Sequence, residues 1–102
     1  MEKEFLVKVH ESYRDVVSVC DIGLIGKKIV EGNFQLDLTG EFYKGEEVDE
    51  EKLKEIIEYQ SGEDATFNVV GDKSIEVFKN LGLVLKEGVR RVGGVSFALV
   101  LV

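Results

Sequence analysis

Short segments in which apolar and polar side chains alternate constrain the fold of this chain more than any other feature. Alternation with a period of two is typical of a β-strand that buries one face, and turn residues separate the segments. Gly93-Gly94 is typical of a two-residue hairpin turn. The pattern predicts strands over these ranges: 5–9, 16–20, 34–38, 66–70, 89–92 and 95–102. The last segment is apolar on both faces, so we expect it to be central or covered on both sides.

The segment 49–60 has the spacing of an amphipathic helix. Asp49 is a favourable N-cap residue, and glutamates follow it in the first turn, where the helix dipole favours negative charge. The apolar side chains of Leu53, Ile56 and Ile57 form a narrow stripe. We therefore expect a helix that faces water over most of its surface.

A second helix is predicted over 73–81, where Ile75, Phe78 and Leu81 lie on one side. Gly82 suits the left-handed position that follows a helix. The order of strands and helices predicts a small α+β domain. It has a mixed or antiparallel sheet, two main helices and a C-terminal β-hairpin.

The composition limits the class of protein. A length of 102 residues suits a single domain over 1–102. One cysteine excludes an internal disulfide, and with one histidine a zinc site would depend on carboxylates, so we expect no metal and no cofactor. The first residues are acidic where a signal peptide is basic, and no apolar run approaches about 18 residues. We therefore expect a cytoplasmic protein without membrane contact, and its 24 lysine and glutamate residues resemble a hyperthermophile composition.

The excess negative charge is confined to one segment. Residues 41–64 hold ten acidic and three basic side chains, and the remaining residues hold ten of each. Such a run is usually a solvated helix face, but Glu51, Glu55 and Glu58 could also form an acidic surface that docks a basic protein. DNA specificity is not expected, and RNA could bind only at a local basic patch.

Several candidate site residues lie near the ends of the first two strands. His10 is the only histidine and has no nucleophile beside it in sequence, so no catalytic residue is predicted. Cys20 is expected to be a small buried side chain. Asp21 either caps the following turn or offers a carboxylate to a ligand. Lys27 and Lys28 lie on the solvated surface, pair with the carboxylate of Asp21 or bind an anion, and the first of these is the simplest interpretation.

Further candidates lie in the second half of the chain. Asn68 and Gly71 lie on a strand-to-helix turn, and the free N–H groups of a helix start can bind an anion. Asp72 would cap the same groups, so a tight turn is the simpler interpretation. Arg90 and Arg91 precede the glycine turn and point to opposite faces of their strand, so only one of them can contact an RNA.

Taken together, several motifs resemble a family of small archaeal proteins known as a domain of unknown function, number 424. The motifs follow one another over nearly the whole chain: Cys20-Asp21, Leu24-Ile-Gly-Lys-Lys28, Phe42-Tyr-Lys-Gly-Glu46, Asn68-Val-Val-Gly71, Leu81-Gly-Leu-Val84 and Gly93-Gly-Val95. The resemblance implies an archaeal cytoplasmic protein and brings no activity. In this family the glycine turn is often followed by Val-Pro-His-Ala, whereas this chain has Val95-Ser-Phe-Ala98, with Phe97 at the histidine position. The comparison lowers the expectation of an enzyme.

Two functions from different classes are open on the sequence. The first is a non-catalytic accessory module that docks on a protein or on an RNA–protein assembly, which the absence of a catalytic pair and the polarised charge favour. The second is a small-ligand-binding protein or enzyme with a site near Asp21, Lys27 and Asn68. If these side chains line one pocket, the second function is favoured. If they stabilise turns instead, the first function is favoured.

Overall fold

Residues 2–101 are described by a computed structural model that contains eight strands, two helices and two short 3-10 turns. The strands are β1 (Phe5–His10), β2 (Val16–Asp21), β3 (Lys28–Glu31), β4 (Phe34–Asp37), β5 (Glu46–Val48), β6 (Thr66–Val70), β7 (Arg90–Val92) and β8 (Val95–Leu101). The helices are α1 (Glu50–Gly62) and α2 (Asp72–Asn80), and the 3-10 turns are η1 (Ile22–Leu24) and η2 (Lys86–Gly88). Val102, the end of the last predicted strand, lies outside the described residues.

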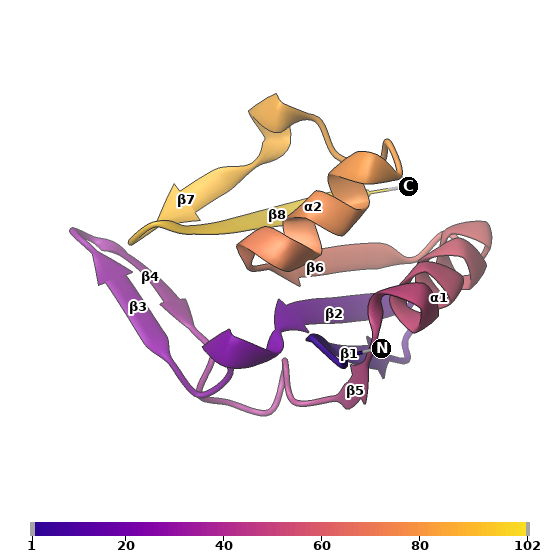
Figure 1. Cartoon of the computed structure of the whole chain (residues 1–102), viewed down its shortest axis with the longest axis horizontal. Coiled ribbons are helices and arrows are strands. Elements are labelled where there is room, and N and C mark those ends of the chain that lie inside the picture. Colours follow the sequence, from indigo (N-terminus) through magenta and orange to yellow (C-terminus); the bar gives the residue numbers. More distant parts are fainter. Residues whose placement is uncertain (1, 102) are drawn as a thin grey trace.

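Six strands form one sheet in the order β5-β1-β2-β6-β8-β7, and both helices lie on the same face of it (Figure 1). The pairing of β2 with β6 is parallel, and the other pairings are antiparallel. The predicted α+β fold with a mixed sheet, two main helices and a C-terminal β-hairpin is confirmed.

The main hydrophobic core lies between this sheet and the two helices. Alternate residues of the strands point into it, among them Val17 of β2 and Phe67 of β6. Phe78 of α2 meets Phe67 edge-on, with ring centroids 5.3 Å apart. Leu53 and Ile57 of α1 are also fully buried in this core. The alternation recognised in the sequence therefore defines the face that the helices cover.

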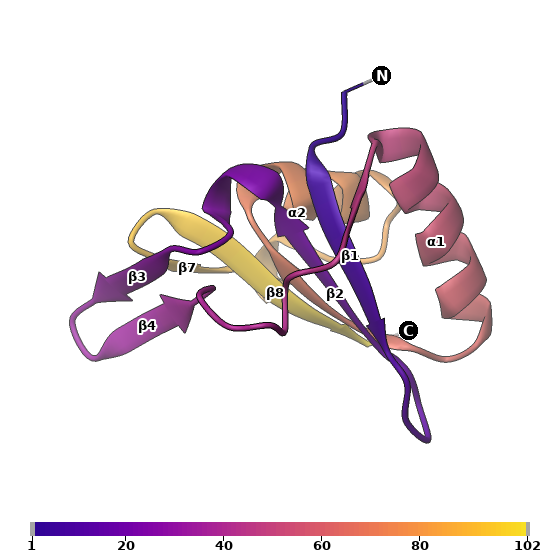
Figure 2. The same ribbon diagram turned by 90° about the horizontal axis from the view of Figure 1, so that it is seen from below.

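β3 and β4 form a separate two-stranded sheet, which projects from the molecule on the side away from α1 (Figure 2). The sequence does not predict β3 or β5, because both are short and nearly lack buried apolar side chains. β5 has three residues, of which only Val48 is buried, and β3 has four residues and buries none of them fully. Leu38, just after β4, is buried with Cys20 and Val70 in a second, smaller core on the face opposite the helices.

Local signals set the lengths of the helices. Asp49 Oδ1 accepts a hydrogen bond from Lys52 N–H at 2.8 Å, so α1 begins where predicted. Gly82 has a φ of 73° just after α2. Leu81 is 41% exposed, in contrast to the prediction, because α2 ends one residue before it. No helix among residues 2–101 is long and apolar enough to cross a membrane.

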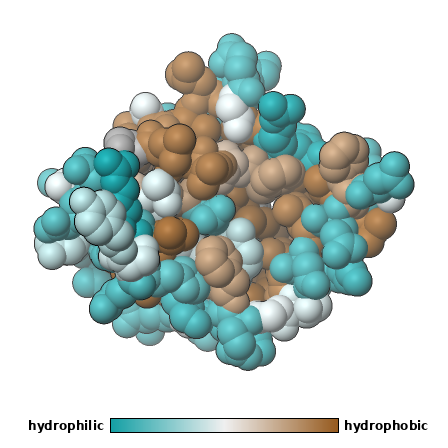
Figure 3. All heavy atoms as spheres, turned by 180° about the vertical axis from the view of Figure 1, so that it is seen from behind, coloured by the Kyte–Doolittle hydropathy of each residue, from teal (hydrophilic) through white to brown (hydrophobic). Residues whose placement is uncertain are grey.

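The last strand is not covered on both faces, which corrects the expectation from its sequence. Ala98 and Val100 are buried on the helix side, whereas Leu99 is 60% and Leu101 is 71% exposed. β8 is next to the edge of the sheet, and on this face only Val95 and Phe97, near its start, pack against the smaller core beside the β3–β4 hairpin. Figure 3 views the molecule from the side opposite Figure 1 and shows apolar side chains gathered across this face.

Candidate functional site

Asp21 at the end of β2 is bonded to the first turn of α2. Its Oδ2 accepts a hydrogen bond from Lys73 N–H at 3.1 Å, and its Oδ1 accepts from Ser74 N–H at 2.8 Å and from Ser74 Oγ at 2.6 Å. The free N–H groups and dipole of a helix start favour such a carboxylate. Asp21 therefore caps a helix distant in sequence and does not cap the turn that follows it.

Gly71 leaves the space that this carboxylate occupies. Its φ is 109°, and a Cβ at this position would lie 2.3 to 2.6 Å from the carboxylate atoms of Asp21. Its N–H donates to the carbonyl oxygen of Ser96 at 2.7 Å. The geometry of Gly71 thus belongs to a tight strand-to-helix turn that joins three segments of the chain.

Asp72 faces β8 and does not cap α2, in contrast to the sequence interpretation. Its Oδ1 accepts a hydrogen bond from Ser96 Oγ at 2.5 Å and lies 3.6 Å from Arg91 Nη1. Asp21 already occupies the N–H groups of the helix start, which leaves Asp72 free to contact the neighbouring strand. Arg91 also donates to Gly94 O at 3.1 Å. Arg90, on the opposite face of β7, is exposed.

Lys27, Lys28 and Asn68 do not join Asp21 in one hollow. Asp21 lines two hollows, one of about 120 Å³ with Asp72 and one of about 410 Å³ with Lys73, and neither is lined by Lys27, Lys28 or Asn68. Asn68 pairs with Ser18 in the middle of the sheet, whereas Asp21 lies at the end of β2. The two lysines are exposed at the start of the β3–β4 hairpin. The candidate residues of the ligand-site hypothesis therefore lie apart from one another and do not form one pocket.

Cys20 is fully buried in the smaller core on the face opposite the helices. Burial, and to a smaller extent the charge of Asp21, raises the pKa of its thiol to about 12. Burial also raises the pKa of Tyr43, which packs against the same core, to about 12. A cysteine reacts as the thiolate, so Cys20 is chemically inert near neutral pH.

His10 and Ser18 are close together but are not arranged as a base and a nucleophile. His10 Nε2 lies 3.0 Å from the carbonyl oxygen of Phe42 and 3.4 Å from Ser18 Oγ, and Ser18 Oγ lies 2.9 Å from the same carbonyl oxygen. A carbonyl only accepts hydrogen bonds, so both side chains donate to it, and His10 Nε2 does not accept the proton of Ser18 Oγ. The His10 ring stacks on the Phe42 ring with centroids 4.3 Å apart. This group anchors the segment around Phe42 to the sheet.

The acidic surface of α1 is formed by Glu51, Glu55 and Glu58. All three side chains are exposed, and none forms an ion pair with another residue of 2–101. By contrast, Glu50 pairs with Lys54 at 3.1 Å. The outward face of α1 therefore carries three carboxylates without a basic neighbour in contact.

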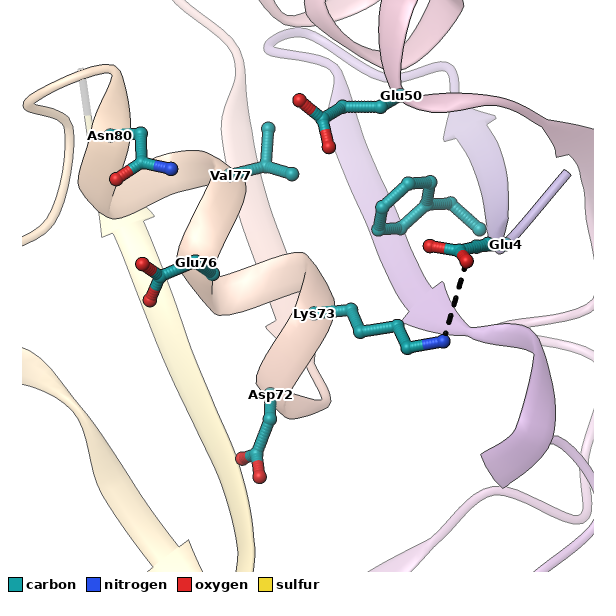
Figure 4. A pocket seen from close by; sticks show the side chains of 8 residues that line it. Glu4, Glu50, Asp72, Lys73, Glu76, Val77 and Asn80 are labelled. Carbon is teal, nitrogen blue, oxygen red and sulfur yellow. Dashed lines mark ion pairs between the residues drawn. The ribbon is translucent and has the colours of Figure 1, made fainter. Parts of the chain in front are cut away.

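A pocket of about 370 Å³ lies between α2 and the first turn of α1 (Figure 4). Its polar lining is mainly acidic, and Lys73 extends across it to form an ion pair with Glu4 at 3.5 Å. Figure 4 shows Glu50 and Glu76 coming from different helices, apart from this pair. Within residues 2–101, no group of three or more histidine, cysteine or acidic side chains could hold a metal ion. The pocket therefore offers acidic surroundings and no formed metal site.

Sequence reasoning missed a groove of about 540 Å³ between α1 and β1. It is lined by Val7, Val9, Glu46, Lys52, Glu55, Ile56, Tyr59 and Gln60. Gln60 is only 7% exposed, and its Oε1 has no hydrogen-bond partner among residues 2–101. Gln60 follows Leu53 and Ile57 with the spacing of the inward stripe of α1. A polar residue at that inward position was the signal by which the sequence could have revealed the groove.

Comparison with known proteins gives a family and a fold. Residues 9–102 match the model of a family described as "Protein of unknown function (DUF424)". A solved structure described as an uncharacterized conserved protein from Methanopyrus kandleri is similar, with a TM-score of 0.80 and 22% sequence identity, over 93% of this chain and 88% of that one. At this identity the likeness concerns the fold alone. No curated protein matches the chain.

Proposed function

The chain belongs to the DUF424 family of proteins of unknown function, as its motifs indicate, and we propose that it is a non-catalytic binding module that docks on a basic protein through α1. The observation that carries this proposal is the set of three exposed, unpaired carboxylates at Glu51, Glu55 and Glu58. Such a concentration of charge accelerates association with a partner of opposite charge.

The position of Asp21 favours docking over the alternative of a small-ligand site or an enzyme. Its carboxylate accepts three hydrogen bonds from Lys73 and Ser74, which leaves it little capacity for a ligand. The thiol of Cys20 is buried, and His10 Nε2 is bonded to the carbonyl oxygen of Phe42, so these two groups supply no nucleophile–base pair. A binding role requires none of these groups.

The chemistry of the acidic surface favours a protein over a nucleic acid. Carboxylates repel phosphate groups, so an RNA would have to bind elsewhere, near exposed Arg90. A basic protein that is itself part of an RNA–protein assembly has the required charge. We also infer an archaeal, cytoplasmic setting, which the Methanopyrus kandleri relative and the lysine- and glutamate-rich composition support.

Glutamine replacements test the docking surface. A tagged form of the protein captures its partners from an archaeal lysate, and the main protein partner is then purified for binding measurements at low and high salt. The Glu51→Gln/Glu55→Gln/Glu58→Gln variant should bind this partner several-fold more weakly at low salt, mainly through slower association. Added salt should reduce the difference between the variant and the parent.

A matched control removes the same charge from other elements. Glu11, Glu76 and Glu87 are exposed and lie on the β1–β2 loop, α2 and η2. Their triple glutamine variant should bind the partner nearly as the parent does. If both variants lose the same affinity for the partner, the effect comes from net charge and not from the surface of α1. If neither variant loses affinity, the outer face of α1 does not contact the partner. If an RNA is captured and binds the parent and both triple variants equally, the RNA contacts another surface of the protein.

A further inference from the structure

One edge of β1 is open beyond Glu46, the first residue of β5. β5 pairs with β1 no further than Val7, whereas β1 continues to His10. Gly45, just before β5, lies so close to the Val7 carbonyl that a Cβ there would be 2.1 Å from its oxygen. The chain before Gly45 crosses to the opposite face of the sheet, where Phe42 stacks on His10. Among residues 2–101, no strand neighbours this edge of β1 after Val7.

Val9 presents the free backbone groups of this edge. Ile22 N–H donates to the carbonyl oxygen of Glu4 at 3.0 Å, which turns the hydrogen-bonding groups of Glu4 toward β2. In an antiparallel pair, successive residues turn these groups to alternate sides, so those of Phe5, Val7 and Val9 point toward the β5 side. Val9 lies beyond the β1–β5 pairing, and no turn or loop hydrogen bond from residues 2–101 reaches its backbone. Its N–H and C=O are therefore available to an added strand.

The groove between β1 and α1 lies against this open edge. Val7, Val9 and Ile56 supply apolar lining, and Tyr59 is 65% exposed beside them. A strand that paired with Val9 would place every second side chain toward the groove, because side chains alternate along a strand. Strand addition with pockets for alternate side chains is a common way of recognising an extended peptide.

Two polar features of the groove define the ligand further. Glu46 and Glu55 line it, and neither forms an ion pair with another residue of 2–101. Lys52 is the one basic side chain of the lining. The buried Oε1 of Gln60 lacks a hydrogen-bond donor among residues 2–101, although buried polar atoms in folded proteins are nearly always paired. The groove therefore suits a ligand with a positive charge and an N–H donor.

We propose that this groove binds an extended, basic segment of a partner protein, which adds to the free edge of β1 as a short strand. The proposal rests on the docking function above and specifies how the partner is held. The backbone of the segment pairs with Val9, apolar side chains contact Val7 and Ile56, a lysine or arginine lies near Glu46 and Glu55, and a donor reaches Gln60. The acidic surface of α1 steers the segment toward the groove.

Synthetic peptides test the strand pairing. The probe is a short peptide in which every second residue is in turn valine and lysine and the residues between them are serine, so that the groove-facing side chains include both apolar and basic ones. It is titrated into the protein while amide resonances are followed by NMR. The backbone amide of Val9 and the side-chain amide of Gln60 should shift. N-methylation of every second peptide amide, made in both registers, should weaken binding about three- to tenfold per lost hydrogen bond in the register that pairs. The same peptide with glutamate in place of lysine should not bind.

Unmoved Val9 and Gln60 resonances at saturating peptide would overturn the proposal, as would equal binding of both N-methylated peptides. A concentration-dependent dimer that protects the Val9 amide in the absence of peptide would assign the groove to a second copy of the chain instead. Sedimentation of the protein alone detects such a dimer.

Protein variants separate this proposal from the docking function on which it rests. Gln60→Met keeps the shape of the side chain and removes the amide, and it should weaken the valine–lysine peptide about three- to tenfold. Glu51→Gln/Glu58→Gln changes only residues outside the groove lining and should weaken the peptide less. If Glu51→Gln/Glu58→Gln weakens binding of the captured partner but Gln60→Met leaves the affinity for the peptide unchanged, the groove proposal fails and the docking function stands. If the same double variant leaves the affinity for the partner unchanged while the peptide shifts the Val9 amide resonance, the docking surface on α1 fails and the groove proposal stands.

Discussion

The two faces of the six-stranded sheet are built from the same strands and are covered by different segments. On the helix side, α1 and α2 cover the sheet, and Val17 and Phe67 of its central strands are 0% exposed. On the other side, the β3–β4 hairpin and the residues after it cover one end of the sheet, where Cys20 is buried. At the other end, Leu99 and Leu101 are 60% and 71% exposed.

This difference shows that the course of the chain sets burial in this fold, more than the apolar character of the strand residues. Val100 and Leu101 are neighbours of similar hydrophobicity, yet Val100 is 2% and Leu101 is 71% exposed. A helix with an apolar stripe gives continuous cover to one face of a sheet. A hairpin of two four-residue strands is too short to do the same on the other face.

Truncation of one apolar side chain on each face should break or confirm the comparison most clearly. Phe67→Ala empties a fully enclosed site and should lower the free energy of unfolding by about 3–5 kcal/mol. Leu99→Ala removes a side chain that is largely in water and should lower it by less than about 1 kcal/mol. Urea denaturation of the two variants gives both values.

Phe67→Ala could leave too little stability for folding, since a small domain has about 5–15 kcal/mol in total. The milder pair Val100→Ala and Leu101→Ala then makes the same comparison within β8. A larger loss for Leu101→Ala than for Val100→Ala would show that the exposed face is covered in solution.

Substitution of Gly71, in the turn between β6 and α2, should have the next largest effect on stability. Gly71→Ala introduces a Cβ where φ is 109° and where the Asp21 carboxylate leaves no space. We expect a loss of about 2–4 kcal/mol, from backbone strain and displacement of the cap. Gly82→Ala is the matched control, because Gly82 has a φ of 73° and no heavy atom near the added Cβ. It should lose only about 1–2 kcal/mol.

An Asp21→Ala background isolates the crowding at Gly71. With the carboxylate gone, Gly71→Ala should lose clearly less stability than it does in the parent, which a double-mutant cycle measures by thermal or urea unfolding. If the cost of Gly71→Ala is the same in both backgrounds, the contact with Asp21 has no energetic weight and backbone strain alone explains it.

The smallest expected effect concerns the thiol of Cys20, which is buried on the sheet face opposite the helices. The pKa of Cys20 is about 12 in the folded chain and 9.0 in the reference state. As pH rises above 9.0, the unfolded chain loses its proton first, so the free energy of unfolding should fall. We expect a fall of up to about 1 kcal/mol between pH 9 and pH 10, and a shallower fall in Cys20→Ala. Parallel pH profiles for the two proteins, or rapid alkylation of the native thiol at pH 7, would show that Cys20 is accessible.

Much of the architecture was predictable because its signals are local. The period-two segments became β1, β2, β4, β6, β7 and β8, and Asp49, Gly82, Gly93 and Gly94 occupy the cap and turns their chemistry suits. The strands β3 and β5 were missed because their residues are mostly exposed, so the partner strand and not the residue pattern makes them strands. Leu81 was misplaced because the end of α2 decides which way it points.

The candidate site was less predictable, because its residues are defined by contacts between distant segments. Sequence reasoning recognised Asp21 and Gly71 as special positions but assigned the cap of α2 to Asp72. Proximity in sequence favours Asp72, whereas the parallel pairing of β2 with β6 brings Asp21 directly to the first turn of α2. The open edge at Val9 depends on where β5 begins, at Glu46 opposite Val7, and no local pattern encodes that position.

The sequence by itself determined the fold class, the helix that starts at Asp49, the glycine hairpin and the concentration of charge in residues 41–64, because each of these depends on side chains within a few positions of one another. The tertiary structure decided which strand face is covered, which carboxylate caps α2 and where β1 is left without a neighbour. These properties arise from strand order and from the length of the covering segments. Contacts of that range are fixed only when the whole chain packs.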